Sequence, residues 1–191
     1  MQLVLASTSV YRKQLLEKLG IPFVTASPNI DESPLENETA QQLVMRLAEA
    51  KAKAVATQFA DALIIGSDQV AVLDEQILGK PGDFFNAVAQ LTAASGKQID
   101  FKTGLCLYNS RTQHGQTTCE TYSVVFRRLS EERIKSYVRT EEPYDCAGSF
   151  KSEGLGITLF ERLIGDDPNT LIGLPLIALV RMLEKEGIYL P

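Results

Sequence analysis

Two long segments of alternating apolar and polar residues, about 98–108 and 116–128, constrain the fold most strongly. In the first segment one face carries Ile99, Phe101, Thr103, Leu105 and Leu107. A short polar stretch containing the single histidine, His114, separates the two segments. A period of two on both sides of a turn predicts an antiparallel pair of strands. Any parallel strands elsewhere must therefore join this pair in a mixed sheet.

Shorter apolar runs alternate with helical periodicity along the rest of the chain. Buried strands are predicted at 3–6 and 62–66, and further strands at 23–26, 70–73 and 157–160. Helices are predicted after Ser7 or Ser9, from Thr39 to about 59, at 83–94, after Ser130 and around 176–186. The pattern predicts an α/β fold with a mixed, twisted central sheet and flanking helices, in one domain over residues 1–191.

Composition and charge exclude several function classes. The net charge of −5 makes the chain a poor binder of nucleic acid or anionic lipid. No apolar run approaches the roughly 18 residues of a membrane span, and the start lacks the basic and apolar regions of a secretory leader. Three cysteines without a Cys-x-x-Cys spacing indicate reduced thiols, so we expect a cytoplasmic protein. From the charge and the short apolar runs we expect neither nucleic acid nor a membrane as a partner.

The single histidine also limits the chemistry. His114 lies in a polar turn, where a solvated role is the simplest interpretation. Catalytic triads, Cys-His pairs and histidine-rich metal sites are therefore improbable. An enzyme with this composition must depend on carboxylates, lysines, arginines and a hard metal ion.

Arg12 is the first charge that lies on a predicted apolar face. It shares the stripe of Leu15, Leu16 and Leu19, one turn from the start of the first helix. A helix N-terminus disfavours a cation unless an anion joins it. Arg12, Ser7 and the free amides could together hold a phosphate group. The alternative is an arginine that extends over the end of the helix toward solvent.

Lys51 and Asp68 are the next two anomalies. Lys51 lies between Val44 and Leu47 on the apolar stripe of the second long helix. A buried lysine needs a partner, either a structural carboxylate or an anionic ligand. Asp68 follows the apolar run 62–66, where α/β folds place ligands, and is interpreted as a base, a metal ligand or a turn cap.

The remaining charges are weaker signals taken singly. Lys80 lies between Gly79 and Pro81, and Asp31 and Glu32 lie in an acidic loop. No Gly-x-x-x-x-Gly-Lys-Ser/Thr motif occurs, which excludes a P-loop NTPase. Three cations with carboxylates and no histidine suit phosphoryl chemistry with Mg²⁺ or Mn²⁺. These residues together predict a hydrolase of phosphate esters or anhydrides.

Five motifs, in the same order along nearly the whole chain, resemble the Maf family of nucleotide pyrophosphatases. They are Ala6-Ser7-Thr8-Ser9-Val10-Tyr11-Arg12, Gly66-Ser67-Asp68-Gln69, Gly79-Lys80-Pro81, Ala147-Gly148-Ser149-Phe150 with Glu153, and Gly173-Leu174-Pro175. Asp68-Gln69 and the segment 149–154 resemble the subgroup that acts on 7-methyl-GTP.

The resemblance implies a two-lobed, inosine-triphosphatase-like fold around a cleft, and a homodimer. It implies hydrolysis of a nucleoside triphosphate, here 7-methyl-GTP, to the monophosphate and pyrophosphate with a divalent cation, Mg²⁺ or Mn²⁺. Asp68 matches the family's proton acceptor, and a further set matches its phosphate- and metal-side residues: Ser7, Arg12, Glu32, Lys51 and Lys80. Which residues ligate the metal stays open. Tyr11, Gln69 and Glu153 match positions that set the preference for the base.

Two adjacent positions depart from the subgroup's pattern. Tyr11 stands where the subgroup usually has tryptophan, and Val10 where it has proline. A tyrosine ring still stacks on an electron-poor methylated base, with less area. The alternatives are a pyrophosphatase for other canonical or modified nucleotides, and a non-catalytic nucleotide-binding regulator of cell division.

Overall fold

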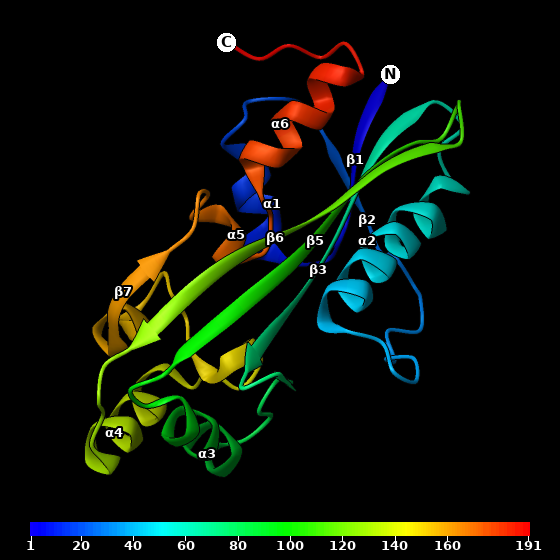
Figure 1. The fold of residues 1–191 in the computed structure, drawn as a ribbon. Helices are drawn as coiled ribbons and strands as arrows, with labels where there is room; N and C mark the ends of the chain where they lie inside the picture. Colours follow the sequence, from blue (N-terminus) through cyan, green and yellow to red (C-terminus); the bar gives the residue numbers. More distant parts are fainter. The chain divides into compact units, whose positions relative to one another are not determined.

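The computed structural model describes all residues, Met1–Pro191, and contains one seven-stranded mixed sheet (Figure 1). The strand order is β2-β1-β3-β5-β6-β7, with β4 paired to β3. β1 is parallel to β2 and β3, whereas β4 and β7 are antiparallel to their neighbours β3 and β6. The strands are β1 (Gln2–Ala6), β2 (Val24–Ala26), β3 (Ala62–Leu73), β4 (Gln76–Leu78), β5 (Gln98–Asn109), β6 (His114–Phe126) and β7 (Phe160–Ile164). The predicted mixed sheet with flanking helices is confirmed.

Most of the helices begin at a side chain that accepts a backbone amide hydrogen. They are α1 (Val10–Glu17), α2 (Ala40–Ala56), α3 (Phe84–Ala94), α4 (Glu131–Glu141), α5 (Asn169–Ile172) and α6 (Leu176–Lys185). Ser9, Thr39, Asp83 and Ser130 cap α1 to α4 in this way. At α2 the cap is reciprocal, since Gln42 also bonds back to the Thr39 amide. None of the helices combines the length and the apolar character needed to cross a bilayer.

The chain forms two compact units. Unit 1 comprises residues 1–69, 102–120 and 167–191, and unit 2 comprises residues 70–101 and 121–166. The long strands β3, β5 and β6 contribute residues to both units. The cleft implied by the family resemblance stays a prediction.

Unit 1 has a core on each face of its part of the sheet. Along β1, Leu3 and Leu5 pack with residues of α1 and α6, whereas Val4 and Ala6 pack with residues of α2. This division follows from the alternation of side chains across a strand. Figure 1 shows α1 and α6 on one side of β1 and α2 on the other. The sheet of unit 1 is thus covered on both faces, as its parallel strands require.

Unit 2 has an aromatic core. Phe101, Phe126, Phe150 and Phe160 meet edge to face, with ring centroids 4.9 to 5.6 Å apart. Such contacts add to the apolar area that the rings remove from water. Phe150 directly follows a short 3₁₀ helix, Ala147–Ser149.

Two predictions of local structure were wrong. β3 is one continuous strand through Ser67, Asp68 and Gln69, because the buried Ser67 hydroxyl lies 2.9 Å from the carbonyl oxygens of Gly104 and Gly173. Polar residues inside a strand are tolerated when they find such partners. The predicted strand 157–160 is instead a 3₁₀ helix, Leu155–Leu159, and β7 follows it.

Candidate functional site

A buried lysine joins two carboxylates in unit 1. Lys51 Nζ lies 2.7 Å from Asp68 Oδ1 and 3.1 Å from Glu32 Oε1. Lys51 and Asp68 are only 5% and 7% exposed, whereas the Glu32 side chain is 55% exposed. Lys51 reaches this place because α2 turns its apolar stripe toward the sheet, and Lys51 lies on that stripe. The partners of the predicted buried lysine are thus carboxylates on β3 and on the loop before α2.

Asp68 lies just beyond the end of a parallel pair of strands. β1 pairs with β3 as far as Leu5 opposite Ile65, and Ser7 follows β1 directly. Asp68 is therefore beyond the carboxyl end of β1, although β3 continues past it. Open α/β sheets place ligands at such ends. Ser7 is buried, and its hydroxyl accepts the amide hydrogen of Ser9, the cap of α1.

Arg12 is half-buried at the start of α1 and is held by one backbone carbonyl. Its Nε donates to the oxygen of Gly173 at 2.9 Å. Burial lowers the pKa of the Arg12 guanidinium, and the negative charges of Asp68 and Glu32 oppose this shift. Arginine still stays protonated near neutral pH. Its two terminal nitrogens have no protein acceptor, so they are available to an anion.

The other two predicted site residues of unit 1, Gln69 and Tyr11, differ in how far their side chains are free to contact a ligand. The Gln69 side-chain nitrogen donates to Thr103 Oγ1 at 2.8 Å and to the Thr170 carbonyl at 2.7 Å. The amide nitrogen is thus committed to the protein, and only its oxygen is left for a ligand. Tyr11 is 41% exposed, which leaves its ring accessible.

Lys80 and Glu153 belong to unit 2 and are both exposed. The charges of both side chains affect the pKa of the Cys146 thiol. Burial raises this pKa, the negative charge of Glu153 raises it further, and the positive charge of Lys80 lowers it. The structure thus forms one group from Arg12, Glu32, Lys51 and Asp68 in unit 1. In unit 2, Lys80 and Glu153 both lie near the Cys146 thiol.

The protein supplies two carboxylates where the residues of unit 1 converge. No group of three or more His, Cys, Asp or Glu side chains is arranged to hold a metal ion. Asp68 and Glu32 nevertheless share one cationic partner, so their oxygens lie close together. Magnesium is commonly held by one or two carboxylates with substrate phosphates and water as the other ligands. The donor set therefore fits a hard divalent cation that arrives with a polyphosphate.

The roles of three residues around this site were missed in the sequence, although Gly173 lies in one of the five motifs. The Gly173 carbonyl orients Arg12, while Arg46 and Glu38 form an ion pair beside the Glu32 loop. A contact made by a backbone carbonyl does not depend on the residue type, so the sequence does not reveal it. The pair could have been suspected only from Glu38 preceding the Thr39 cap and Arg46 following two turns into the helix. This spacing does not predict a contact between the two side chains unless the path of the loop is known.

Comparisons with known proteins agree with the family resemblance and with the fold. The family model described as "Maf-like protein" matches residues 2–186. The 7-methyl-GTP pyrophosphatase of Vibrio cholerae serotype O1 is 59% identical over 188 residues, covering 98% of this chain and 96% of that protein. The protein of the same name from Colwellia psychrerythraea is also 59% identical, covering 97% and 93%.

Two solved structures share the fold at low sequence identity. The Ham1 protein of Staphylococcus aureus has a TM-score of 0.54, and the HAM1 protein of Coxiella burnetii has one of 0.56. Each is 14% identical to this chain and covers 97% of it, with 100% and 99% of the other chains matched. The predicted inosine-triphosphatase-like architecture is thereby confirmed at the level of the fold.

Proposed function

Because the chain belongs to the Maf-like protein family, we propose that it hydrolyses 7-methyl-GTP to 7-methyl-GMP and pyrophosphate. The observation that carries the proposal is the convergence of Arg12, Lys51, Glu32 and Asp68 from four different segments of unit 1. Two relatives named 7-methyl-GTP pyrophosphatase match almost the entire chain.

The two cations neutralise the triphosphate. Arg12 uses its free terminal nitrogens while Gly173 holds Nε, so the guanidinium is oriented before the substrate arrives. Lys51 is likewise held in place, by two carboxylates. Prepositioned charges stabilise a phosphoryl transition state without reorganisation during the reaction. Ser7 and Lys80 complete the proposed phosphate-binding set.

A divalent cation, Mg²⁺ or Mn²⁺, belongs to the proposal. Glu32 and Asp68 would hold it, and it would neutralise phosphate charge when bound. Glu32 is the more exposed of the two carboxylates, so it can meet an incoming ion first.

Asp68 is the proposed general base. Its carboxylate takes a proton from a water molecule, whose oxygen forms a bond to the α-phosphorus. The bond from that phosphorus to the bridging oxygen breaks, and pyrophosphate leaves with the electron pair. Lys51, in contact with Asp68 Oδ1, keeps the carboxylate oriented.

Base preference is assigned to Tyr11, Gln69 and Glu153. A methylated guanine carries a positive charge, which favours stacking on an aromatic face, and the Tyr11 ring is accessible. Glu153 is exposed and can accept hydrogen bonds from the guanine edge. Gln69 can offer its side-chain oxygen, since its nitrogen is bonded within the protein.

The decisive experiment uses Asp68→Asn. We expect this variant to lose about 10²- to 10⁴-fold in pyrophosphate release, the range for a lost general base, while circular dichroism shows an intact fold. The assay is a panel of 7-methyl-GTP, GTP, UTP and CTP with Mn²⁺, with release of pyrophosphate as the readout.

Asp61→Asn is the matched control, because Asp61 directly precedes β3, is exposed, and its side chain pairs only with the exposed Arg111, at 3.8 Å. Near-normal turnover by Asp68→Asn would contradict the role of the base. A wild type that prefers another nucleotide would favour the alternative substrate, and binding without turnover would favour a regulator.

The proposal includes a cytoplasmic homodimer that takes neither nucleic acid nor membrane as a partner. Three free cysteines, one of them buried, suit a reducing compartment. Light scattering of the purified chain measures the oligomeric state directly.

A further inference from the structure

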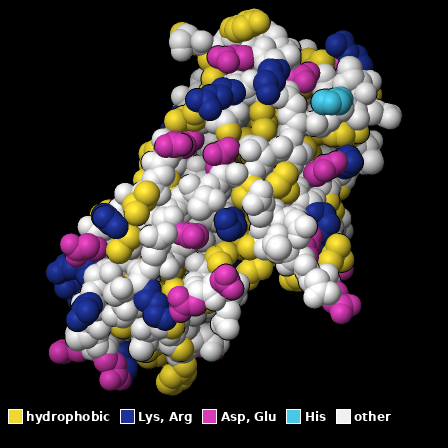
Figure 2. Space-filling view, in the orientation of Figure 1, with side chains coloured by type: hydrophobic (Ala, Val, Ile, Leu, Met, Phe, Trp, Pro, Cys, Tyr) yellow, Lys and Arg dark blue, Asp and Glu magenta, His cyan; other side chains and the backbone are white.

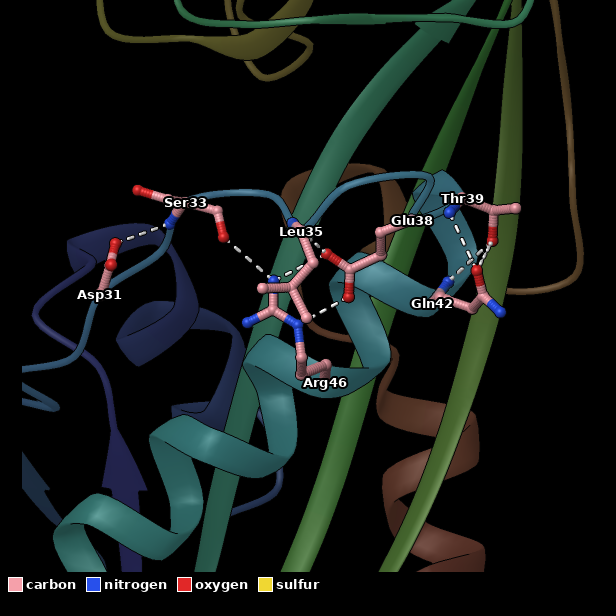
Figure 3. A network of polar contacts seen from close by, with 7 residues as sticks. All are labelled: Asp31, Ser33, Leu35, Glu38, Thr39, Gln42 and Arg46. Carbon is pink, nitrogen blue, oxygen red and sulfur yellow. Dashed lines mark hydrogen bonds and ion pairs between the residues drawn. The ribbon is translucent and has the colours of Figure 1, made fainter.

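The loop that carries Glu32, residues 27–39, is tied to α2 by a single arginine (Figure 3). Arg46 extends from α2 toward this loop and contacts it at two places. Its Nε and Nη2 donate to the two oxygens of Glu38, at 2.6 and 2.7 Å, and Nη2 also donates to the Ser33 carbonyl at 3.1 Å. This fork-like pairing fixes orientation as well as distance.

Two hydrogen bonds within the loop also hold its backbone close to Glu32. Asp31 accepts the amide hydrogen of Ser33 at 2.9 Å, which closes a tight turn around Glu32. Glu38 accepts the amide hydrogen of Leu35 at 3.0 Å while it binds Arg46. The Glu38 side chain is only 7% exposed and that of Arg46 is 31% exposed, so this pair is partly buried. These contacts hold the backbone at Ser33 and Leu35, which follow Glu32, while the Glu32 carboxylate contacts Lys51.

The same helix provides both anchors. Arg46 holds the loop backbone at Ser33, and Lys51, five residues later on α2, holds the Glu32 carboxylate. The loop has no secondary structure of its own, and Glu32 must approach a second carboxylate, Asp68, of the same charge. One ion pair to a carboxylate that is more than half exposed is a weak restraint against that repulsion. The Arg46–Glu38 pair adds a second, partly buried contact that holds the loop.

We propose that the Arg46–Glu38 pair is a positioning device that presents Glu32 beside Lys51 and Asp68 for the reaction. The inference rests on the proposed function, in which Glu32 receives the divalent cation with the triphosphate. Arg46 and Glu38 touch neither substrate nor metal in this account; they act through the loop. Sites whose supporting contacts are loosened by even 1 Å lose much of their activity.

The test replaces the anchor and leaves the functional groups in place. Arg46→Met should lower kcat/KM for 7-methyl-GTP about 10- to 100-fold, the usual cost of losing an outer-shell support. Arg46→Lys should rescue little, because one ammonium cannot reproduce the fork to Glu38 and the contact to Ser33. Glu38→Gln, which is nearly isosteric, should give a loss in the same direction.

Lys53→Met is the matched control. It removes a cation from the same helix and breaks the Lys53–Glu49 ion pair, which is exposed and shares no residue with the contacts that hold the loop. Its kcat/KM should equal that of the wild type. Activity of Arg46→Met equal to that of Lys53→Met would overturn the inference.

A double-mutant cycle with Glu32→Gln separates positioning from general stability. If Arg46 acts through Glu32, adding Arg46→Met to Glu32→Gln should cost less than threefold more activity. Full additivity of the two losses would overturn the positioning role.

Hydrogen exchange gives a readout that does not need turnover. The amides of Ser33 and Leu35 should exchange at least tenfold faster in Arg46→Met, with the amides of α2 unchanged. Unchanged exchange at Ser33 and Leu35 would contradict the inference even if activity fell. A wild type without turnover on any nucleotide would instead overturn the proposed function, while the exchange result would still report on the anchor itself.

Discussion

Lys51 and Arg46 lie on the same helix, yet only one of them could be singled out from the sequence. Lys51 interrupts an apolar stripe, and a charge in that place requires a partner. Asp68 could be predicted from the apolar run before it, whereas Glu32 was one of two acids in a polar loop until the family resemblance assigned it a role. Arg46 and Glu38 lie on no such stripe, and their pairing depends on a loop path that periodicity does not encode.

Glu38 predicts a pH dependence of stability. Hydrogen bonds from Arg46 lower its pKa from 4.5 to about 2. The folded state therefore favours the ionised carboxylate, and this stabilisation is complete above pH 4.5 and is lost as the pH falls toward 2. The difference in unfolding midpoint between wild type and Glu38→Gln should stay constant above about pH 5 and shrink below it. Urea titrations followed by circular dichroism measure this difference.

Glu36→Gln is the control for that series, because Glu36 lies in the same loop, is exposed and makes no ion pair. Its difference from wild type should not change between these pH values. A Glu38→Gln difference that grows on acidification would contradict the assigned ion pair.

At the scale of elements, α2 lies unusually close to the sheet of unit 1. A Cβ on Gly66 would come within 2.0 Å of the Ala48 carbonyl oxygen, and one on Gly104 within 2.1 Å of the Val44 carbonyl oxygen. These glycines on β3 and β5 let the backbone of α2 approach directly. The sequence offered Gly66 as part of a motif, but its packing role depends on a helix 18 residues earlier.

Gly66→Ala should therefore push α2 away from β3. We expect a loss of about 1–3 kcal/mol in unfolding free energy, the usual cost of overpacking. That corresponds to a fall in Tm of roughly 2–4 °C per kcal/mol for a chain of this size. Calorimetry measures the shift. Gly79→Ala is the control, since a Cβ there meets nothing within 4 Å; equal melting temperatures for the two variants would refute the close-packing account.

At the scale of the whole molecule, the fold was predictable because two signals agreed. Period-two alternation marked β5 and β6, and apolar runs followed by helical periodicity marked the parallel part around β1 and β3. Boundaries failed where tertiary partners decided, as at Ser67 and at 155–159. The HAM1 proteins reach the same architecture with 14% identity, so the fold alone does not specify the reaction. Function has to be argued from the charged residues.

Exposed charged side chains of both signs are mixed on the surface (Figure 2). Figure 2 shows basic and acidic side chains interspersed over the visible face, on a chain of net charge −5. A polyanionic substrate therefore depends on a few placed cations and not on a general positive field. In unit 1 these cations are Arg12 and Lys51, and in unit 2 the proposal assigns this role to Lys80.

Lys80→Met tests whether unit 2 takes part in the chemistry. We expect kcat/KM for 7-methyl-GTP to fall at least tenfold, because one phosphate charge would lose its counter-charge in the transition state. Lys97→Met is the matched control: Lys97 is also an exposed lysine of unit 2, and its pair with Asp74 contributes little to stability. Steady-state kinetics at several ionic strengths compare the two. If both variants behave alike, the cations of unit 1 suffice for the triphosphate, and the family match at Lys80 reflects some other role.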